Sequence, residues 1–369
     1  MRKNTCLLLL STLMLSACNN GQGPSNVVSP VKGKKVAYII NMPETEIFSL
    51  CANQCVEISN KLGMSCDIFY SNGDDELFNE KVKYCASNNY DGLFLSHGGR
   101  DYSYNLITDL ISEHKDLKIV TFDTDFIGED GKEKKIDGVT QFFQDDVDLA
   151  TTLLKYTTNT LEPNKSPVNI LKVWVGPGYL SAFDRREVGY KAMEESGKIH
   201  TVETIGPSDR QNPTESMKEV MTETLKKYDE SDIDAIWVAY DAYAQGCYQA
   251  LKEANKNIPL VSIDLSNQDI TYMLEENSLW KACACTDFKQ NGEMGIRLLA
   301  LELNNEYNLI KASNSTAKTD YIEMPASLIT GDILKPNSNI SNIYDVAPET
   351  YGNKSTYVTS DWLKNLIGY

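Results

Sequence analysis

The chain has 369 residues, of which 41% are apolar, and a formal net charge of −17. This length and apolar content can supply a large core, most economically divided between two domains. The acidic balance argues against nucleic acid and anionic membrane surfaces as partners, because both repel negative charge.

The first residues have the order of a secretory signal peptide. Arg2 and Lys3 precede an interrupted apolar run at residues 7–15, and small residues stand directly before Cys18. The run is shorter than the roughly 20 residues that cross a bilayer as a helix. Residues 1–17 are therefore excluded from the fold. Residues 18–33 then form an expected flexible tether, because they are rich in Asn, Gly, Ser and Pro.

The cysteine at the expected cleavage point resembles that of the bacterial lipobox. By this resemblance Cys18 becomes the first mature residue and carries the lipid, which places the protein in the cell envelope on a membrane anchor. An ordinary signal peptide that happens to contain a cysteine is the alternative.

The remaining cysteines do not indicate a metal site or a cofactor. There is no CxxC pair, and the three histidines lie far apart in the sequence, at His97, His114 and His200. A buried free cysteine behaves as a small apolar residue, and we expect that role for the seven cysteines of the mature body: Cys51, Cys55, Cys66, Cys85, Cys247, Cys283 and Cys285.

A first series of apolar strands alternates with helical patterns. Strands are predicted at residues 36–40, 66–70, 92–95 and 118–122, and helices at 46–62, 77–86 and 102–114. Continuous apolar strands joined by helices indicate a parallel sheet that is covered on both faces.

The alternation restarts after a charged, turn-like stretch at residues 131–137. Strands are predicted at 168–175, 201–205, 235–239, 260–263 and 280–285, with helices at 147–161, 186–195, 215–228, 244–255, 268–276 and 291–303. Two such series predict an α/β protein with two doubly wound parallel-sheet domains. Ligands of open α/β sheets bind at the carboxyl ends of the strands, so two facing domains would form a cleft there and close by a hinge movement.

The ordered series resembles the type I periplasmic sugar-binding proteins, the ribose- and galactose-binding group, over about residues 35–330. Phe48 follows the first strand, and the helix in this region ends at Lys61-Leu62-Gly63, as in that family. Residues 120–123 and 261–264 resemble its two strands that end in Asp, and residues 182–190 resemble its Arg-containing helix start. Residues 327–330 resemble its last strand.

The resemblance implies discontinuous domains joined by a hinge of several strands. The chain is expected to cross near residues 143–145, near Thr286 and near Pro325. The first domain then holds residues 34–143 and 287–324, and the second holds 144–286 and 325–369, with residues 334–369 as an extension beyond the usual family end.

The resemblance also implies a set of ligand-binding residues. Carboxylates and arginine bind sugar hydroxyls strongly because one partner is charged, and aromatic rings cover the C–H face of a sugar. The expected residues are Phe48, Asp123, Asp184, Arg185, Arg186, Tyr240, Asp241, Asp264 and Thr286.

Several of these roles have alternatives. Asp123 and Asp264 are the leading candidates, with the capping of a helix or turn as their alternative role. Asp125 can serve in place of Asp123, and Asp241 can cap a helix. Spacing does not decide between Arg185 and Arg186. Tyr240 stands where the family has Asn, and Thr124 where it often has Arg, so the resemblance does not identify a particular sugar.

The function that follows is binding without catalysis. The chain has no Gly-x-Ser-x-Gly elbow, no Gly-x-Gly-x-x-Gly loop and no metal triad. We expect a monomeric receptor that delivers a small polar ligand, a monosaccharide, to the permease of an ABC importer. Delivery of a signal to a membrane sensor, or binding of a nucleoside between Phe48 and Tyr240, are the alternatives.

Overall fold

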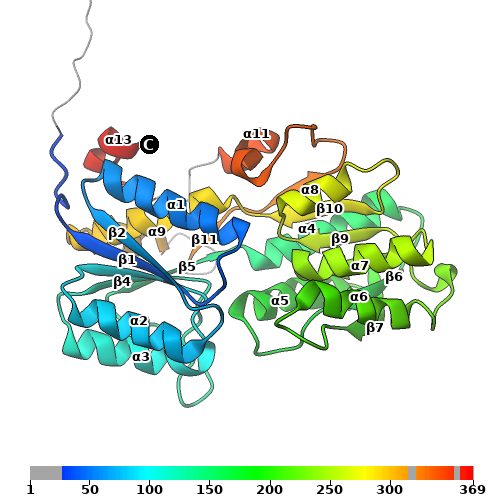
Figure 1. The fold of residues 1–369 in the computed structure, drawn as a ribbon, viewed down its shortest axis with the longest axis horizontal. Coiled ribbons are helices and arrows are strands. Elements are labelled where there is room, and N and C mark those ends of the chain that lie inside the picture. The colour runs from blue at the N-terminus through cyan, green and yellow to red at the C-terminus, as the bar shows by residue number, and fades with distance from the viewer. Residues whose placement is uncertain (1–26, 315–320, 353–357, 369) are drawn as a thin grey trace, which may run out of the picture.

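The computed structural model of the protein describes residues 27–314, 321–352 and 358–368. It contains two α/β lobes placed side by side, each built on a six-stranded sheet (Figure 1). The expected signal peptide, Cys18 and most of the tether lie outside the described residues. No helix in the described part of the chain combines the length and the apolar character needed to cross a membrane.

The sheet of the first lobe is parallel throughout and has the strand order β11-β5-β4-β3-β1-β2. Its strands are β1 (Lys35–Ile40), β2 (Ser65–Tyr70), β3 (Gly92–Ser96), β4 (Lys118–Phe122), β5 (Val139–Gln144) and β11 (Ile322–Met324). All five residues of β3 are buried, as a strand covered by helices on both faces requires.

The sheet of the second lobe has the order β12-β10-β9-β8-β6-β7 and is parallel except for its edge strand, β12. Its strands are β6 (Val168–Val173), β7 (Ile199–Ile205), β8 (Ala235–Val238), β9 (Leu260–Ile263), β10 (Trp280–Cys285) and β12 (Ser327–Thr330). The central strands β8 and β9 are buried at every residue. The predicted fold class is therefore confirmed.

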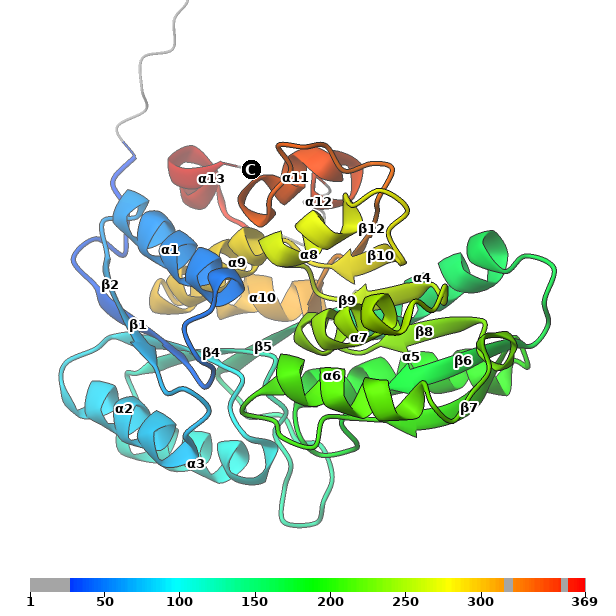
Figure 2. The ribbon, with the colours of Figure 1, turned by 45° about the vertical axis from the view of Figure 1, so that its right-hand side comes forward.

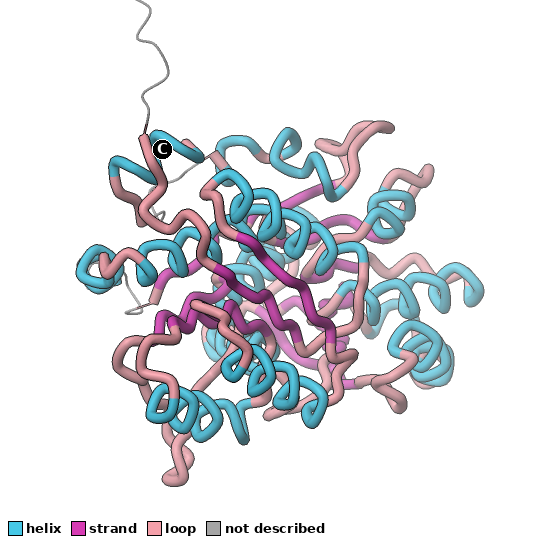
Figure 3. Tube along the Cα trace, turned by 60° about the vertical axis from the view of Figure 1, so that its left-hand side comes forward, coloured by secondary structure: helices cyan, strands magenta, loops and turns pink. Residues whose placement is uncertain are grey.

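Helices cover both faces of the first sheet (Figure 3). Helices α1 (Glu46–Lys61) and α9 (Phe288–Leu303) lie on one face, and α2 (Asp75–Ser87) and α3 (Arg100–Glu113) lie on the other. Gly292 permits the close packing of α9 on α1, because an added Cβ there would lie 2.3 Å from the carbonyl oxygen of Cys51. The short helix α10 (Tyr307–Asn314) follows α9.

The helices of the second lobe pack in pairs. Helix α4 packs on α5 and α6 on α7, and Gly246 lets α7 approach the backbone of Thr214 in α6. The segments are α4 (Asp146–Tyr156), a π-helical turn (Thr157–Leu161), α5 (Ser181–Glu195), α6 (Pro213–Thr224), a 3₁₀ turn (Glu230–Asp232), α7 (Asp241–Ala254) and α8 (Asn267–Met273).

The chain passes between the two sheets three times before the C-terminal extension. It leaves the first sheet after β5, returns after β10, and leaves again between β11 and β12. The sequence analysis did not predict β5 or β11. Strand β5 was missed because Thr140, Gln141 and Gln144 interrupt its apolar pattern, although all three are buried.

The C-terminal extension lies along both lobes, whereas the sequence analysis expected residues 325–369 to belong to the second. Its helical segments are a 3₁₀ turn (Ile340–Asn342), α11 (Ile343–Val346), α12 (Pro348–Tyr351) and α13 (Asp361–Ile367). Ile343 and Tyr351 pack in the core of the second lobe. Leu363 of α13 packs in the core of the first lobe, beside α1 (Figure 2). The apolar residues of α13 pack in the same core cluster as residues of α1 and α9. The sequence order does not predict this contact between the end of the chain and the first lobe.

The seven cysteines of the body are free thiols. Six are buried, and Cys66 is half-buried. They pack as small apolar residues, as the sequence analysis expected.

Candidate functional site

A cavity of about 470 Å³ lies between the two lobes, and both contribute to its walls. Of the expected ligand-binding residues, Phe48, Arg186, Tyr240 and Asp264 line it. The lining also includes side chains that the sequence analysis did not select for the site. These additional lining residues include His97, Gln144, Tyr179, Phe183, Arg210, Tyr243 and Phe288.

Three polar residues directly follow parallel strands at this cleft, and each of them has a left-handed backbone conformation. His97 follows β3 with φ 59°, Asp123 follows β4 with φ 46°, and Asp264 follows β9 with φ 68°. Non-glycine residues in this region are uncommon, and such positions concentrate at functional sites. The carboxyl ends of the strands in both lobes therefore meet at the cavity, as the fold predicts.

Arg186 is the charged centre of the second-lobe wall. Its Nε donates to Asp146 Oδ1 at 2.9 Å, and its Nη1 donates to Asp264 Oδ2 at 3.1 Å and to the carbonyl oxygen of Ala239 at 2.6 Å. Burial opposes the charge, but the carboxylates of Asp264 and Asp146 outweigh it and raise the pKa of Arg186. The guanidinium is thus a fixed cation that orients two carboxylates.

Asp146 is a member of this group that sequence reasoning missed. It is the first residue of α4 and is fully buried. Asp146 lies two residues beyond β5, directly after the first crossover, and this position could have identified it as a site residue. The sequence analysis did not predict β5 and therefore did not select Asp146.

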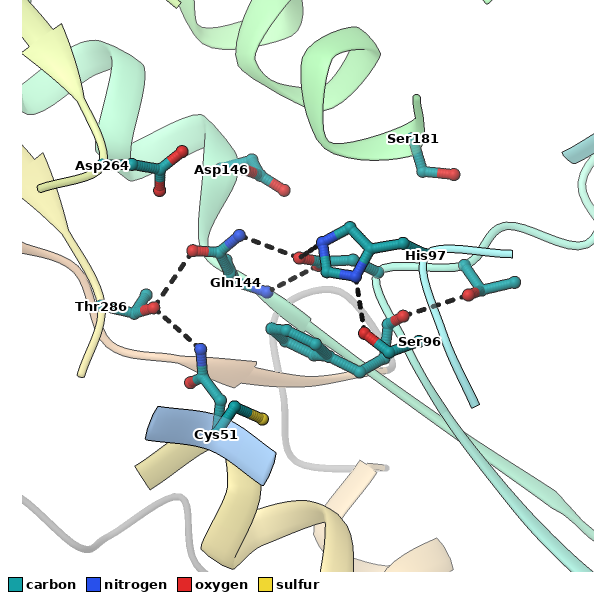
Figure 4. Close-up of polar contacts among 12 residues, drawn as sticks. Cys51, Ser96, His97, Gln144, Asp146, Ser181, Asp264 and Thr286 are labelled. Atoms are coloured by element: carbon teal, nitrogen blue, oxygen red, sulfur yellow. Dashed lines mark hydrogen bonds and ion pairs between the residues drawn. The ribbon is translucent and has the colours of Figure 1, made fainter. Parts of the chain in front are cut away.

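Asp123 lies behind the cavity wall and holds Gln144 in place. Gln144 donates to Asp123 Oδ2 through Nε2 at 2.8 Å and to Oδ1 through its backbone nitrogen at 3.2 Å. Thr286 Oγ1 in turn donates to Gln144 Oε1 at 3.1 Å and accepts from Asn291 at 3.0 Å (Figure 4). This network joins two of the crossovers and leaves Gln144, not Asp123 or Thr286, at the cavity.

His97 occupies the first-lobe side of the cavity. Its Nε2 lies 3.8 Å from Asp123 Oδ2, and its Nδ1 lies 2.5 Å from Ser96 Oγ (Figure 4). Its ring packs edge-on against Phe48 with 5.2 Å between ring centres. Burial lowers the pKa of His97 to about 4, so the imidazole is neutral at pH 7 and can both donate and accept a hydrogen bond.

Aromatic side chains form a second wall, which we call the aromatic wall: Tyr179, Phe183, Tyr240 and Tyr243. The rings of Tyr240 and Tyr243 meet edge-on at 5.3 Å, and Tyr179 stacks on Phe183 at 6.0 Å. The guanidinium of Arg210 lies 4.3 Å from the ring centre of Tyr179, at the edge of this wall.

The structure places the other expected residues outside the cavity lining. Arg185 lies over the ring of Phe143 and pairs with Asp146 and Glu323. Since Arg186 lines the cavity, the choice between the two arginines falls on Arg186.

The remaining two expected carboxylates also have protein partners. Asp184 forms an ion pair with Arg100 of the first lobe and accepts from the backbone nitrogen of Gly178 at 2.9 Å. Asp241 accepts from the backbone nitrogen of Ala242 at 2.8 Å, at the start of α7. Asp241 is the first residue inside α7, whose N-cap position is Tyr240, so the structure does not give Asp241 the capping role that the sequence allowed.

Across residues 27–314, 321–352 and 358–368, no three His, Cys, Asp or Glu side chains are arranged to hold a metal ion. The cavity instead offers a fixed cation, carboxylate oxygens and aromatic faces, which together can bind a polar molecule by hydrogen bonds and ring contacts.

Comparisons with known proteins agree with this geometry. Residues 36–307 match a family described as "Periplasmic binding protein domain". A sugar ABC transporter structure from Yersinia enterocolitica is 30% identical, covers 90% of this chain and 94% of its own, and has a TM-score of 0.74. A comparison with curated protein sequences gives no match.

Two more distant structures share the fold. A 5-methylthioribose transporter solute-binding protein from Thermotoga lettingae is 21% identical, with a TM-score of 0.74 and coverage of 90% and 98% of the two chains. An ABC transporter solute-binding protein from Agrobacterium vitis with bound allitol is 15% identical, with a TM-score of 0.64 and coverage of 85% and 99%.

Proposed function

The chain belongs to the periplasmic binding protein family, with the type I fold, and from that premise we propose that it captures a monosaccharide and delivers it to an ABC importer. This family consists of extracytoplasmic solute-binding proteins and not of enzymes. The proposal adds the ligand class, the lipid anchor and the binding residues.

The cavity between the lobes carries the proposal. Arg186 and Asp264 present charged hydrogen-bonding groups from the second lobe, and His97 and Gln144 present neutral ones from the first. Vicinal hydroxyls of a sugar match such a set, because each hydroxyl can donate to a carboxylate and accept from a guanidinium. The name of the Yersinia structure, a sugar ABC transporter, supports the same ligand class.

The proposed binding residues are those that line the cavity: Phe48, His97, Gln144, Arg186, Tyr240 and Asp264. We assign Asp123, Asp146 and Thr286 to the support of these residues, because they hydrogen-bond to Gln144 or Arg186. In this proposal closure of the two lobes around the sugar is the signal that a permease reads.

A thermal-shift screen of the purified protein against sugars, polyols, nucleosides and amino acids tests the function. A ligand at 100 times its dissociation constant stabilises the folded state by about 2.7 kcal/mol. We expect a shift with sugars that is smaller in Asp264→Asn at the same ligand concentration. A shift with amino acids alone, or turnover of a substrate, would contradict the proposal.

We also propose that Cys18 carries the lipid that anchors the protein, with residues 19–33 as its tether. Metabolic labelling with a fatty acid analogue tests this. Wild-type protein should incorporate the label and fractionate with membranes, and Cys18→Ser should lose both properties. Labelling that persists in Cys18→Ser would contradict the assignment.

A further inference from the structure

The cavity is divided into a polar part and a large apolar part, and we infer that its ligand is a sugar with an apolar substituent instead of an unsubstituted monosaccharide. This inference rests on the proposed function and specifies its substrate class. Three features of the cavity support it: the small number of polar groups that are available to a ligand, the large number of aromatic side chains, and the volume.

The polar part is small because its buried charged and amide groups already have partners in the protein, and the other such side chains of the lining, Asn72, Arg210 and Gln211, are exposed to solvent. Both carboxylate oxygens of Asp264 accept from Arg186, at 3.1 and 3.5 Å. Gln144 donates to Asp123 and accepts from Thr286. A hexose or pentose presents hydroxyls around its whole ring, and each hydroxyl that is buried without a partner costs about 1–3 kcal/mol. These groups can satisfy one edge of a sugar, but not its full circumference.

The apolar part comes from both lobes. The second lobe supplies the aromatic wall, all four residues of which line the cavity. The first lobe supplies Phe48 and Phe288, whose rings meet edge-on at 6.2 Å. Aromatic surface of this extent exceeds what one C–H face of a sugar ring covers, and it favours an aliphatic, thioether or aryl group in contact with it.

The volume agrees with a larger guest. About 470 Å³ falls within the range of roughly 300–1,000 Å³ that encloses drug-sized ligands. The arrangement therefore places the sugar ring at Arg186 and Asp264 and its substituent against the aromatic wall. Thioether sugars and nucleosides share this chemistry and are distinguished by the experiment.

Calorimetric titration of matched pairs tests the inference. The pairs are D-ribose with 5-methylthioribose, D-ribose with adenosine, and D-galactose with phenyl β-D-galactoside. In at least one pair we expect the substituted sugar to bind about tenfold more tightly or better, because one apolar group in a fitted pocket changes affinity by roughly 10–200-fold. The pair that shows the effect identifies the substituent as thioether or aryl.

Two variants test whether the preference for the substituted sugar depends on the aromatic wall. Tyr240→Ser removes a ring but keeps a good N-cap residue for α7, and it should reduce the preference for the substituted sugar at least fivefold. Tyr272→Ser, a half-buried tyrosine of the same lobe outside the cavity, should leave the preference unchanged.

The outcomes separate this inference from the proposed function. Equal or tighter binding of the unsubstituted sugars would overturn the inference and leave the proposed function intact. A preference that survives Tyr240→Ser but not Tyr272→Ser would overturn the assignment to the aromatic wall. Absence of binding by every sugar and nucleoside would overturn the proposed function together with the inference.

Discussion

Arg186 donates to Asp264 at 3.1 Å and thereby joins the first turns of α5 to the end of β9. Both residues, and their partner Asp146, belong to helices and strands of the second lobe. This lobe therefore holds its charged groups in position whether or not the first lobe closes on it. Such preorganisation reduces the ordering cost of binding, and it suggests that a ligand docks first on the second lobe and that closure then adds Phe48, His97 and Gln144.

Asp123 follows β4 of the first lobe, and Asp264 follows β9 of the second. The structure predicts different effects when each is replaced by asparagine. Asp264→Asn removes a charged partner of both Arg186 and a ligand hydroxyl, so affinity should fall about tenfold to a hundredfold, as for hydrogen bonds to charged groups. Asp123→Asn keeps an oxygen for Gln144 and tolerates the left-handed backbone. It should lower the free energy of unfolding by about 1–3 kcal/mol and change affinity about threefold or less.

Calorimetry and urea denaturation of the two variants measure these effects. Asp234→Asn is the matched control, since Asp234 is also buried but lies before β8, at the opposite end of the sheet, where it accepts from the backbone nitrogen of Asn169. It should lower stability without changing affinity. A larger loss of affinity in Asp123→Asn than in Asp264→Asn would reverse our assignment of the two acids.

The sequence predicted the architecture well, because buried parallel strands appear as continuous apolar runs. Strands such as β3 and β8 have no polar residue that faces solvent, and periodicity alone identifies them. Strand β5 is buried as well, but its glutamines find partners only in the folded protein: Gln144 in Asp123 and Gln141 in the carbonyl oxygen of Thr124. A one-dimensional pattern contains no information on such pairings.

The sequence predicted the kind of residue that forms the site and its position at the strand ends, but not which individual side chains line the cavity. Sequence placed acids at the ends of strands, where Asp123 and Asp264 are found, but it could not tell which side chain points into the cavity. His97 and Tyr243 were not selected for the site, because both reach the cavity only through the packing of two lobes that lie far apart in the chain. The neighbours Arg185 and Arg186 both pair with Asp146, and only the structure shows that Arg186 alone of the two lines the cavity.

His97 makes the stability of the protein depend on pH. Burial lowers its pKa to about 4, the charge of Arg186 acts in the same direction, and the carboxylate of Asp264 opposes both. The unfolded state, with an ordinary pKa near 6.5, then binds more protons than the folded state between about pH 4 and 6.5. This contribution to stability is complete above pH 6.5 and declines as the pH falls toward 4, by up to about 3 kcal/mol.

Denaturation of wild type and His97→Asn between pH 4 and 7.5 measures this contribution. Asparagine tolerates the positive φ of this position and does not titrate. The free energy of unfolding should fall more steeply with decreasing pH in wild type than in the variant. Parallel profiles would show that His97 is protonated equally in both states.

Glu302 gives the opposite dependence. It is buried in α9 and accepts from Thr140 Oγ1 at 2.5 Å, and burial raises its pKa to about 8. The folded state then binds more protons than the unfolded state between about pH 4.5 and 8, so this contribution is complete below pH 4.5 and is lost as the pH rises through 8. Glu302→Gln should remove the decline, and its advantage over wild type should be several kcal/mol at most at pH 9.

Urea denaturation at pH 5 and pH 9 checks this prediction. Equal pH slopes for wild type and Glu302→Gln would contradict the raised pKa.

The ion pair of Arg100 and Asp184 connects the two lobes beside the cavity. It joins α3 of the first lobe to α5 of the second and can form only when the lobes are close. Partly exposed pairs contribute about 0.2–1 kcal/mol, so Arg100→Gln should weaken ligand binding about two- to fivefold. The change should appear in the rate of dissociation, because the pair stabilises the closed state.

Stopped-flow measurement of release checks this expectation. Lys227→Gln removes a pair with Glu203 that lies within the second lobe, and it should leave the release rate unchanged. A slower association rate with unchanged release in Arg100→Gln would exclude a role in closure.

The C-terminal extension should stabilise the first lobe through α13. Leu363 is fully buried against the core that contains α1 and α9, and Trp362 Nε1 donates to Glu306 Oε2 at 2.7 Å. The loss of a buried leucine side chain costs about 2–5 kcal/mol, so Leu363→Ala should lower the free energy of unfolding by an amount in that range. Leu366→Ala, in the same helix but only half-buried, should cost less than half as much.

Hydrogen exchange followed by mass spectrometry locates the effect. In Leu363→Ala, protection should fall in α1 and α9, which contact α13 or share its core, while β8 and β9 of the second lobe should keep theirs. Because Tyr351 donates to the carbonyl oxygen of Cys285 at 3.1 Å, where β10 ends before the second crossover, Tyr351→Phe should instead reduce protection at that crossover. Identical exchange in both variants and in wild type would show that the extension does not contribute to either lobe.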